Sequence, residues 1–168
     1  MKIMEHRALR GPNRYSRYPT IFMLLDIGEF EEQPSDTLPG FPDRLSQLIP
    51  TLYSHECSVG EPGGFLQRLK RGTWAGHIVE HIALELQCLA GTDVGFGKTY
   101  GTLDKGIYKV VYRYRVESVG LRAGEAAVAL VEAVAHDRPF DIDAVVAELK
   151  VLREDNMLGP SSLSIVEE

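Results

Sequence analysis

The amphipathic segment 73–91 constrains the fold more than any other part of the chain. Thr73 suits an N-cap position and Gly91 the position just beyond a C-terminus, so the residues between them are expected to form a helix of about five turns. Apolar side chains recur along it at helical spacing and form one broad stripe, comprising Ile78, Val79, Ile82, Ala83, Leu86 and Leu89. Because such a stripe must be removed from water, the rest of the chain is expected to pack around this helix.

The opposite arc of this helix is polar, but its composition is not that of a solvated surface. It carries His77, Glu80, His81, Glu85 and Gln87, and it holds no lysine or arginine. A solvated helix face usually mixes both signs of charge. We therefore interpret this arc as the wall of a functional site.

Two histidines on the arc have the spacing of metal ligands. His77 and His81 are four residues apart, so their imidazoles are neighbours on one helix face and can bind a single Zn²⁺. With Glu80 they form a His-x-x-Glu-His sequence, the inverted zincin motif. In such sites the metal polarises a carbonyl group, while the glutamate takes a proton from water and returns it. The pattern predicts zinc-dependent amide hydrolysis with Glu80 as the general base; the alternative is that both histidines are structural.

A zinc site on this helix needs a further ligand from another segment. The upstream loop 54–64 contains a second compact group of ligand-type side chains, in which His55 and Cys57 are the best candidates for a third ligand. The glycines of this loop permit close approach of its backbone to a ligand. The sequence leaves both candidates open.

The composition is that of one globular domain, and it argues against several classes of function. The chain has 168 residues, of which 44% are hydrophobic and 25% charged, and its net charge is −6. The negative charge argues against nucleic-acid binding, and no apolar run approaches the ~20 residues that span a membrane. The first ten residues lack the apolar core of a signal peptide. We therefore expect a cytoplasmic protein in which Cys57 and Cys88 are reduced.

Hydrophobic periodicity predicts an α+β fold, with a mostly antiparallel sheet and helices packed on one of its faces in a single domain. The apolar strand 20–27 is expected to be central and covered on both faces. Asp141 is expected to cap the last helix. The other expected strands are 2–9 and 107–116, and the other expected helices are 42–48, 65–70, 120–136 and 141–153.

Five separated blocks of sequence point to a known family. They are Arg10-Gly-Pro-Asn13, Gly63-Gly-Phe-Leu66, residues 76–87, Val94-Gly-Phe-Gly97 and residues 106–112. Together they resemble the N-terminal domain of the cyanophycin synthetase family, and the resemblance covers almost the whole chain. That family makes cyanophycin, a polyaspartate backbone with arginine on each side-chain carboxylate.

The resemblance implies a domain organisation for the longer protein. Residues 1–155 would form the N-terminal domain, and residues 156–168 would be a truncated linker to an ATP-grasp domain that this chain lacks. A Mur-ligase-like domain would also be missing, and ATP and Mg²⁺ would be needed only in those missing domains. The longer protein is expected to form a homo-oligomer.

The resemblance also implies a function for this domain. In the family it holds the growing polymer, and in some members it carries a metal-dependent hydrolytic site that cuts cyanophycin into primers; His77, Glu80 and His81 fall on that motif. Cyanophycin carries α-carboxylates and guanidinium groups, and the substrate contacts implied for them are Lys98, Arg71, Arg14, Glu85 and Trp74. Lys98 stands where some members are expected to have arginine, so it lacks the bidentate guanidinium fork. The alternative is a non-catalytic module that only binds the polymer.

Overall fold

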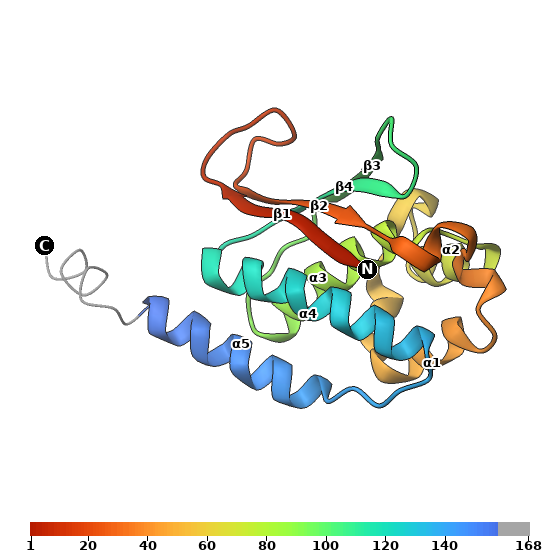
Figure 1. Ribbon diagram of the computed structural model, residues 1–168. Coiled ribbons are helices and arrows are strands. Elements are labelled where there is room, and N and C mark those ends of the chain that lie inside the picture. The colour runs from red at the N-terminus through yellow and green to blue at the C-terminus, as the bar shows by residue number, and fades with distance from the viewer. Residues whose placement is uncertain (158–168) are drawn as a thin grey trace, which may run out of the picture.

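Residues 1–157 are described by the computed structural model, in which four antiparallel strands form one sheet (Figure 1). The strands lie in the spatial order β1-β2-β4-β3, and each neighbouring pair is antiparallel. This arrangement confirms the predicted α+β class. The strands are β1 (Lys2–Leu9), β2 (Thr20–Asp26), β3 (Gly97–Gly101) and β4 (Ile107–Arg113).

The longest helices cover one face of this sheet. The helices α3 (Ala75–Leu89) and α4 (Glu117–Ala135) pack on the strands and on each other, and α5 (Ile142–Met157) packs outside them (Figure 1). No helix within residues 1–157 is long and apolar enough to cross a membrane. The remaining helical elements are α1 (Phe41–Leu48), α2 (Gly64–Arg71) and the 3₁₀ helices η1 (Gly28–Glu32), η2 (Ser35–Thr37), η3 (Pro50–Ser54) and η4 (Cys57–Val59).

The strand β2 is central, as its apolar sequence predicts, but its two faces are covered differently. Ile21, Met23 and Leu25 are fully buried on the side of the helices. On the other side Phe22 is covered by Tyr15 of the loop 10–19, with the two rings stacked and their centroids 5.9 Å apart. On that face, a residue of a loop, rather than a second layer of helices, therefore covers Phe22.

We call the sheet face turned away from α3 and α4 the open face. Directly paired residues of antiparallel strands point to the same side of a sheet, and the register shows which residues share this face. It carries Arg7, Phe22, Lys98, Tyr100 and Lys109.

The edge strand β3 has no counterpart among the expected strands. Its sequence, Gly-Lys-Thr-Tyr-Gly, has two glycines and no apolar alternation, so neither propensity nor pattern marks it as a strand. It is a strand because it pairs with β4, with Lys98 opposite Val111 and Thr99 opposite Val110. Pairing with a neighbour thus overrides a weak local preference.

The predicted cap of the last helix is confirmed, but the helix extends beyond its expected end. The Asp141 carboxylate accepts a hydrogen bond from the Ala144 amide at 3.0 Å. The helix continues to Met157, so residues 156 and 157 are helical. The rest of the predicted linker, 158–168, lies outside the described residues.

Two glycines let α4 lie directly on the sheet. A Cβ atom at Gly124 would lie 2.1 Å from the Tyr112 hydroxyl oxygen and 2.9 Å from the Met23 methyl group, and one at Gly120 would lie 2.7 Å from Cβ of Tyr114. The buried Tyr112 hydroxyl also donates a hydrogen bond to the Gly120 carbonyl at 2.8 Å. The helix and β4 therefore approach more closely than side chains on α4 would permit.

The variant Gly124→Ala should be less stable than wild type. Alanine favours helices by about 1 kcal/mol over glycine, but a methyl group at this position overlaps Tyr112, and overpacking costs about 1–3 kcal/mol. Ala129→Gly on the exposed side of the same helix is the matched control, because it reports the propensity term alone. Chemical denaturation would measure both changes, and a Gly124→Ala protein more stable than wild type would contradict the close packing.

Candidate metal centre

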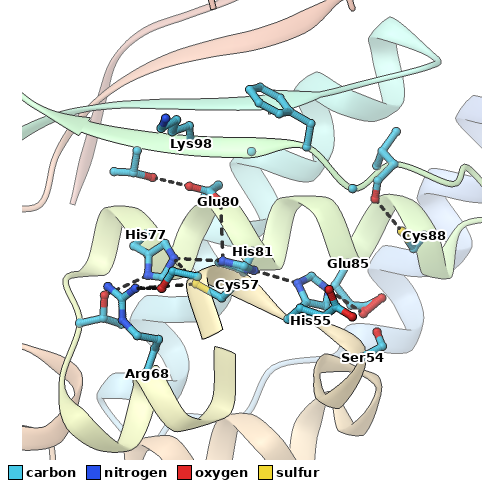
Figure 2. A pocket seen from close by; sticks show the side chains of 18 of the residues that line it. Ser54, His55, Cys57, Arg68, His77, Glu80, His81, Glu85, Cys88 and Lys98 are labelled. Atoms are coloured by element: carbon cyan, nitrogen blue, oxygen red, sulfur yellow. Dashed lines mark hydrogen bonds and ion pairs between the residues drawn. The ribbon is translucent and has the colours of Figure 1, made fainter. Parts of the chain in front are cut away.

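A cleft of about 1010 Å³ opens beside α3. It lies between that helix, β3 and residues 54–59, which we call the 54–59 connection. Figure 2 shows the polar side chains of the cleft along α3. The predicted polar residues of α3 that line it are His77, Glu80, His81 and Glu85.

Gln87 is the member of the predicted polar arc that does not face the cleft. It is fully buried, and its side-chain nitrogen donates to the carbonyl oxygens of Ala83 at 3.3 Å and Arg113 at 3.1 Å. The side chain thus joins α3 to the end of β4. Its assignment to the wall of the site was wrong, because the end of β4 packs over this turn of the helix.

Three metal-ligand side chains converge at the cleft wall. Nε2 of His77 lies 3.0 Å from Nε2 of His81 and 3.4 Å from Sγ of Cys57, and the three donor atoms all lie within 4.8 Å of one another. A tetrahedral zinc ion with Zn–N of ~2.0–2.1 Å and Zn–S of ~2.3 Å requires separations of about 3.3 and 3.6 Å. A small outward movement of these side chains would thus fit an ion, and the three donors would leave its fourth position open.

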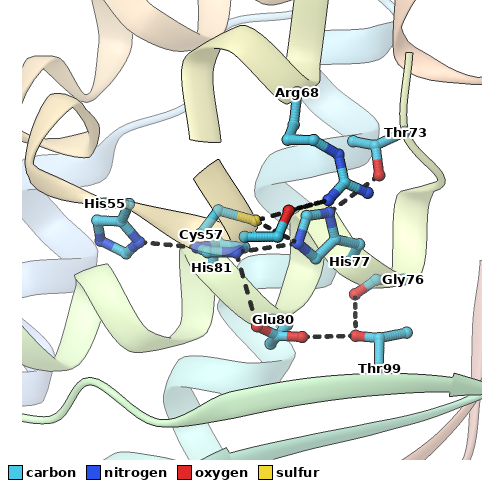
Figure 3. Close-up of polar contacts among 10 residues, drawn as sticks. His55, Cys57, Arg68, Thr73, Gly76, His77, Glu80, His81 and Thr99 are labelled. Carbon is cyan, nitrogen blue, oxygen red and sulfur yellow. Dashed lines mark hydrogen bonds and ion pairs between the residues drawn. The ribbon is translucent and has the colours of Figure 1, made fainter. Parts of the chain in front are cut away.

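Cys57 reaches this group from the 54–59 connection. Its backbone has a φ of 54°, an uncommon value for a residue with a side chain. The guanidinium of Arg68 on α2 donates hydrogen bonds to Cys57 Sγ at 3.8 Å and to the Ser58 hydroxyl at 2.9 Å (Figure 3). The cysteine is thereby held beside a positive charge and next to His77.

The other ring nitrogens of both histidines have their own partners. Nδ1 of His77 is 2.9 Å from the Thr73 hydroxyl, and Nδ1 of His81 is 2.8 Å from Nδ1 of His55 (Figure 3). The two Nε2 atoms therefore face each other, and that of His77 also faces Cys57 Sγ. Thr73 precedes the helix without capping it, since Trp74 is the N-cap residue and makes no side-chain cap bond.

His55, the other candidate for a third ligand, lies behind His81. Its Nε2 is 3.1 Å from a carboxylate oxygen of Glu85, and its Nδ1 contacts His81. Cys57, and not His55, belongs to the group of three converging donor atoms. Glu85 thus meets a histidine of the site rather than the cleft centre.

Burial keeps the two converging histidines in the neutral form that binds metals. The pKa of His77 is lowered to about 4, mainly by burial and to a smaller extent by the charge of Arg68. The pKa of His81 is lowered to about 2, mainly by burial and to a smaller extent by the neighbouring His77 and His55. Phe65 of α2 stacks on the His81 ring with centroids 4.0 Å apart, which fixes the plane of the imidazole.

Glu80 lies on the side of α3 that faces β3. Its Oε1 accepts a hydrogen bond from the Thr99 hydroxyl at 2.8 Å, and its Oε2 is 3.6 Å from Nε2 of His81. Burial raises the pKa of Glu80 to about 7, against the opposing effect of the Thr99 hydrogen bond. A pKa near neutrality suits a group that takes and returns a proton.

A glycine on β3 makes room for the Glu80 side chain. A Cβ atom at Gly97 would lie 2.7 Å from Cγ of Glu80 and 2.8 Å from its Oε2. Gly97 therefore permits the close approach of β3 to the carboxylate.

The residues implied for substrate binding divide between the two sides of the sheet. Trp74 lines the cleft and is 40% exposed, and Arg71 is exposed at the end of α2. Because neighbouring strand residues point to opposite faces and Thr99 points at Glu80, the Lys98 side chain extends over the open face, with its ammonium 5.9 Å from the Tyr100 ring. Lys98 also lines the cleft where β3 borders it. Arg14 lies over Tyr15, which contacts Tyr100.

Three residues of the site were not among those predicted, namely Phe65, Arg68 and Thr99. Phe65 and Arg68 come from α2, and Thr99 comes from the unrecognised strand β3. The block Gly63-Gly-Phe-Leu66 contains Phe65, but nothing in its spacing links it to His81. Only the packing of α2 and β3 against α3 brings these residues to the site.

Comparisons with known proteins agree with the resemblance. A family model described as the cyanophycin synthase-like N-terminal domain matches residues 22–136. Cyanophycin synthetases of Geminocystis herdmanii, Synechocystis sp. and Trichormus variabilis are 45%, 44% and 45% identical to the whole of this chain. The chain spans about a fifth of the length of these relatives, 19–20%. The chain therefore belongs to the family of cyanophycin synthase-like N-terminal domains.

Proposed function

We propose that this domain hydrolyses amide bonds of cyanophycin at a metal ion bound by Cys57, His77 and His81. The observation that carries the proposal is the convergence of three metal-ligand atoms beside a buried carboxylate at the wall of a large cleft. The names of the relatives supply the substrate class, since they are cyanophycin synthetases.

The donor set fits zinc. Two imidazoles and one cysteine sulfur are ligands that zinc prefers, and three protein ligands with an open position are typical of catalytic zinc sites. When bound, the ion would polarise the amide carbonyl and make a water molecule nucleophilic at neutral pH.

Glu80 is the proposed general base. Its Oε1 is occupied by the Thr99 hydroxyl, so Oε2, which lies on the side of His81, is the atom that would take the proton. As a C–O bond forms and the amide C–N bond breaks, the same oxygen would deliver that proton to the departing nitrogen. Thr99 would keep the carboxylate oriented during both transfers.

Polymer binding is a second part of the proposed function, and the open face favours it. Lys98 and Arg14 are exposed cations there, each above a tyrosine ring. Such cations can attract the free α-carboxylates of a long polymer through several weak contacts. They lie across the sheet from Glu80, so holding the polymer does not require the chemistry of the cleft. Synthesis with ATP and Mg²⁺ would belong to the rest of the longer protein.

The variant Cys57→Ala should lose stoichiometric zinc, because it removes one of three proposed ligands. Cys88→Ala is the matched control: Cys88 donates a hydrogen bond to the Val94 carbonyl and is not among the converging donors. Elemental analysis after dialysis against a weak chelator would measure the zinc bound per chain. Full zinc content in Cys57→Ala would remove Cys57 from the ligand set.

The variant Glu80→Gln should retain zinc but cleave cyanophycin about 10²–10⁴-fold more slowly, because an amide cannot accept the proton of water. The matched control is Glu56→Gln, which makes the same change at an exposed carboxylate of the same cleft. Polymer length followed over time would report cleavage. Unchanged cleavage in Glu80→Gln would exclude Glu80 as the base, and a wild type with zinc that never cleaves would disprove the hydrolytic function.

The variant Gly97→Ala should impair cleavage without removing zinc. The added methyl group would displace the Glu80 carboxylate, and a displacement of about 1 Å can cost about 10²-fold in rate. Gly95→Ala is the control on the same segment, since a Cβ atom there has no neighbour within 4 Å. Cleavage rates of zinc-loaded proteins would be compared, and a Gly97→Ala rate equal to that of Gly95→Ala would contradict the importance of the Glu80 position.

A further inference from the structure

We propose that Glu85 and His55 are positioning residues that select the tautomer of His81 in which Nε2 is free to bind a metal. The inference deepens the proposed function and rests on its metal centre. It concerns the hydrogen bonds that His81 makes on its side away from His77 (Figures 2 and 3). Neither His55 nor Glu85 belongs to the His-x-x-Glu-His motif.

The three side chains form a continuous hydrogen-bonded chain. Glu85 Oε2 is 3.1 Å from Nε2 of His55, and Nδ1 of His55 is 2.8 Å from Nδ1 of His81. Figures 2 and 3 show His55 beside His81 on the side away from His77. His81 and Glu85 are four residues apart on α3, so one imidazole can contact both of them.

For a neutral His55 and an ionised Glu85, the chemistry of these groups permits one consistent placement of the hydrogens. A neutral imidazole has one N–H, and an ionised carboxylate only accepts hydrogen bonds. Nε2 of His55 must therefore donate to Glu85, which leaves Nδ1 of His55 as an acceptor. Nδ1 of His81 must then carry a hydrogen and donate to His55. The lone pair of His81 is consequently on Nε2, the atom that faces His77 and Cys57.

The opposite placement is unfavourable at the carboxylate end of this hydrogen-bonded series and incompatible with metal binding at its other end. It would set the Nε2 lone pair of His55 against the Glu85 carboxylate and would place a hydrogen on His81 Nε2, where it blocks metal binding. The side chains of His55 and Glu85 are only 14% and 6% exposed, so little water can compensate for such a repulsion.

His77 is held differently, which makes the role of Glu85 specific to His81. Its Nδ1 meets the Thr73 hydroxyl at 2.9 Å. A hydroxyl can donate as well as accept, so this contact alone does not select a tautomer. Only the series of hydrogen bonds that ends in the Glu85 carboxylate has a fixed order of donors and acceptors.

The test is the tautomer of His81 in the metal-free protein, read from the ¹⁵N chemical shifts of its ring in long-range ¹H–¹⁵N NMR spectra. We expect the Nδ1–H form in wild type. In Glu85→Gln the amide can donate to His55 as well as accept from it, so the Nε2–H form should appear. Zinc affinity, from competition with a chromophoric chelator, should fall about 10–100-fold. Glu56→Gln is the matched control for loss of a charge in the same cleft and should match wild type in both measurements.

A second variant keeps the test valid if Glu85→Gln does not fold. His55→Ala removes the link itself and should likewise weaken zinc binding and release the tautomer of His81. Where both fold, the double variant should lose little more affinity than either single variant, because the two residues act through one chain.

The possible outcomes separate this inference from the hydrolytic function. A His81 tautomer that is unchanged in Glu85→Gln and His55→Ala would overturn the inference, whether or not the domain cuts polymer. Fully additive losses of zinc affinity would also overturn it. The expected tautomer change in a domain that never cleaves cyanophycin would support the inference while the proposed hydrolysis fails.

Discussion

The rest of the site depends on the burial of α3 around most of its circumference. Glu80, His81 and Glu85 are each at most 6% exposed. A buried polar group without a partner costs about 1–3 kcal/mol, so each of these side chains requires one from a neighbouring element. Thr99 of β3 provides it for Glu80, and His55 provides it for both His81 and Glu85. The same hydrogen bonds that satisfy a buried helix thereby hold β3 and the 54–59 connection against it and form the walls of the cleft.

Close approach of backbones is the second requirement, and glycines satisfy it. A Cβ atom at Gly76 would lie 3.3 Å from side-chain atoms of Thr99 and Tyr108, so the first turn of α3 lies directly on β3 and β4. Gly97 makes the corresponding space on the strand, and Gly124 does so where α4 meets Tyr112. Steric access, rather than flexibility, explains why these positions carry no side chain. The position of Glu80 therefore depends on backbone packing as much as on its own helix.

The two sides of the sheet offer different physical environments to a charged polymer. The cleft contains buried groups, whose mutual interactions are strong because little water screens them. The open face presents solvent-exposed cations such as Lys98 and Arg14, whose attraction for carboxylates is weaker and falls with salt. Under the proposed function, the bond would be cleaved in the cleft and the polymer would be held on the open face. The domain would thus need no single surface that serves both purposes.

Local periodicity determined the helix containing the His-x-x-Glu-His motif and the strands β1, β2 and β4, because the spacing of apolar residues is a property of a short segment. For the same reason the proximity of His77, Glu80 and His81 could be predicted from the sequence. The strand β3 could not, because its sequence lacks alternation and only pairing with β4 makes it a strand. Only the tertiary structure placed Cys57, and not His55, with His77 and His81 in one group of converging donor atoms. It also brought Phe65, Arg68 and Thr99 to the site. Such contacts depend on which faces of distant segments pack together, and no short-range pattern in a chain encodes that choice.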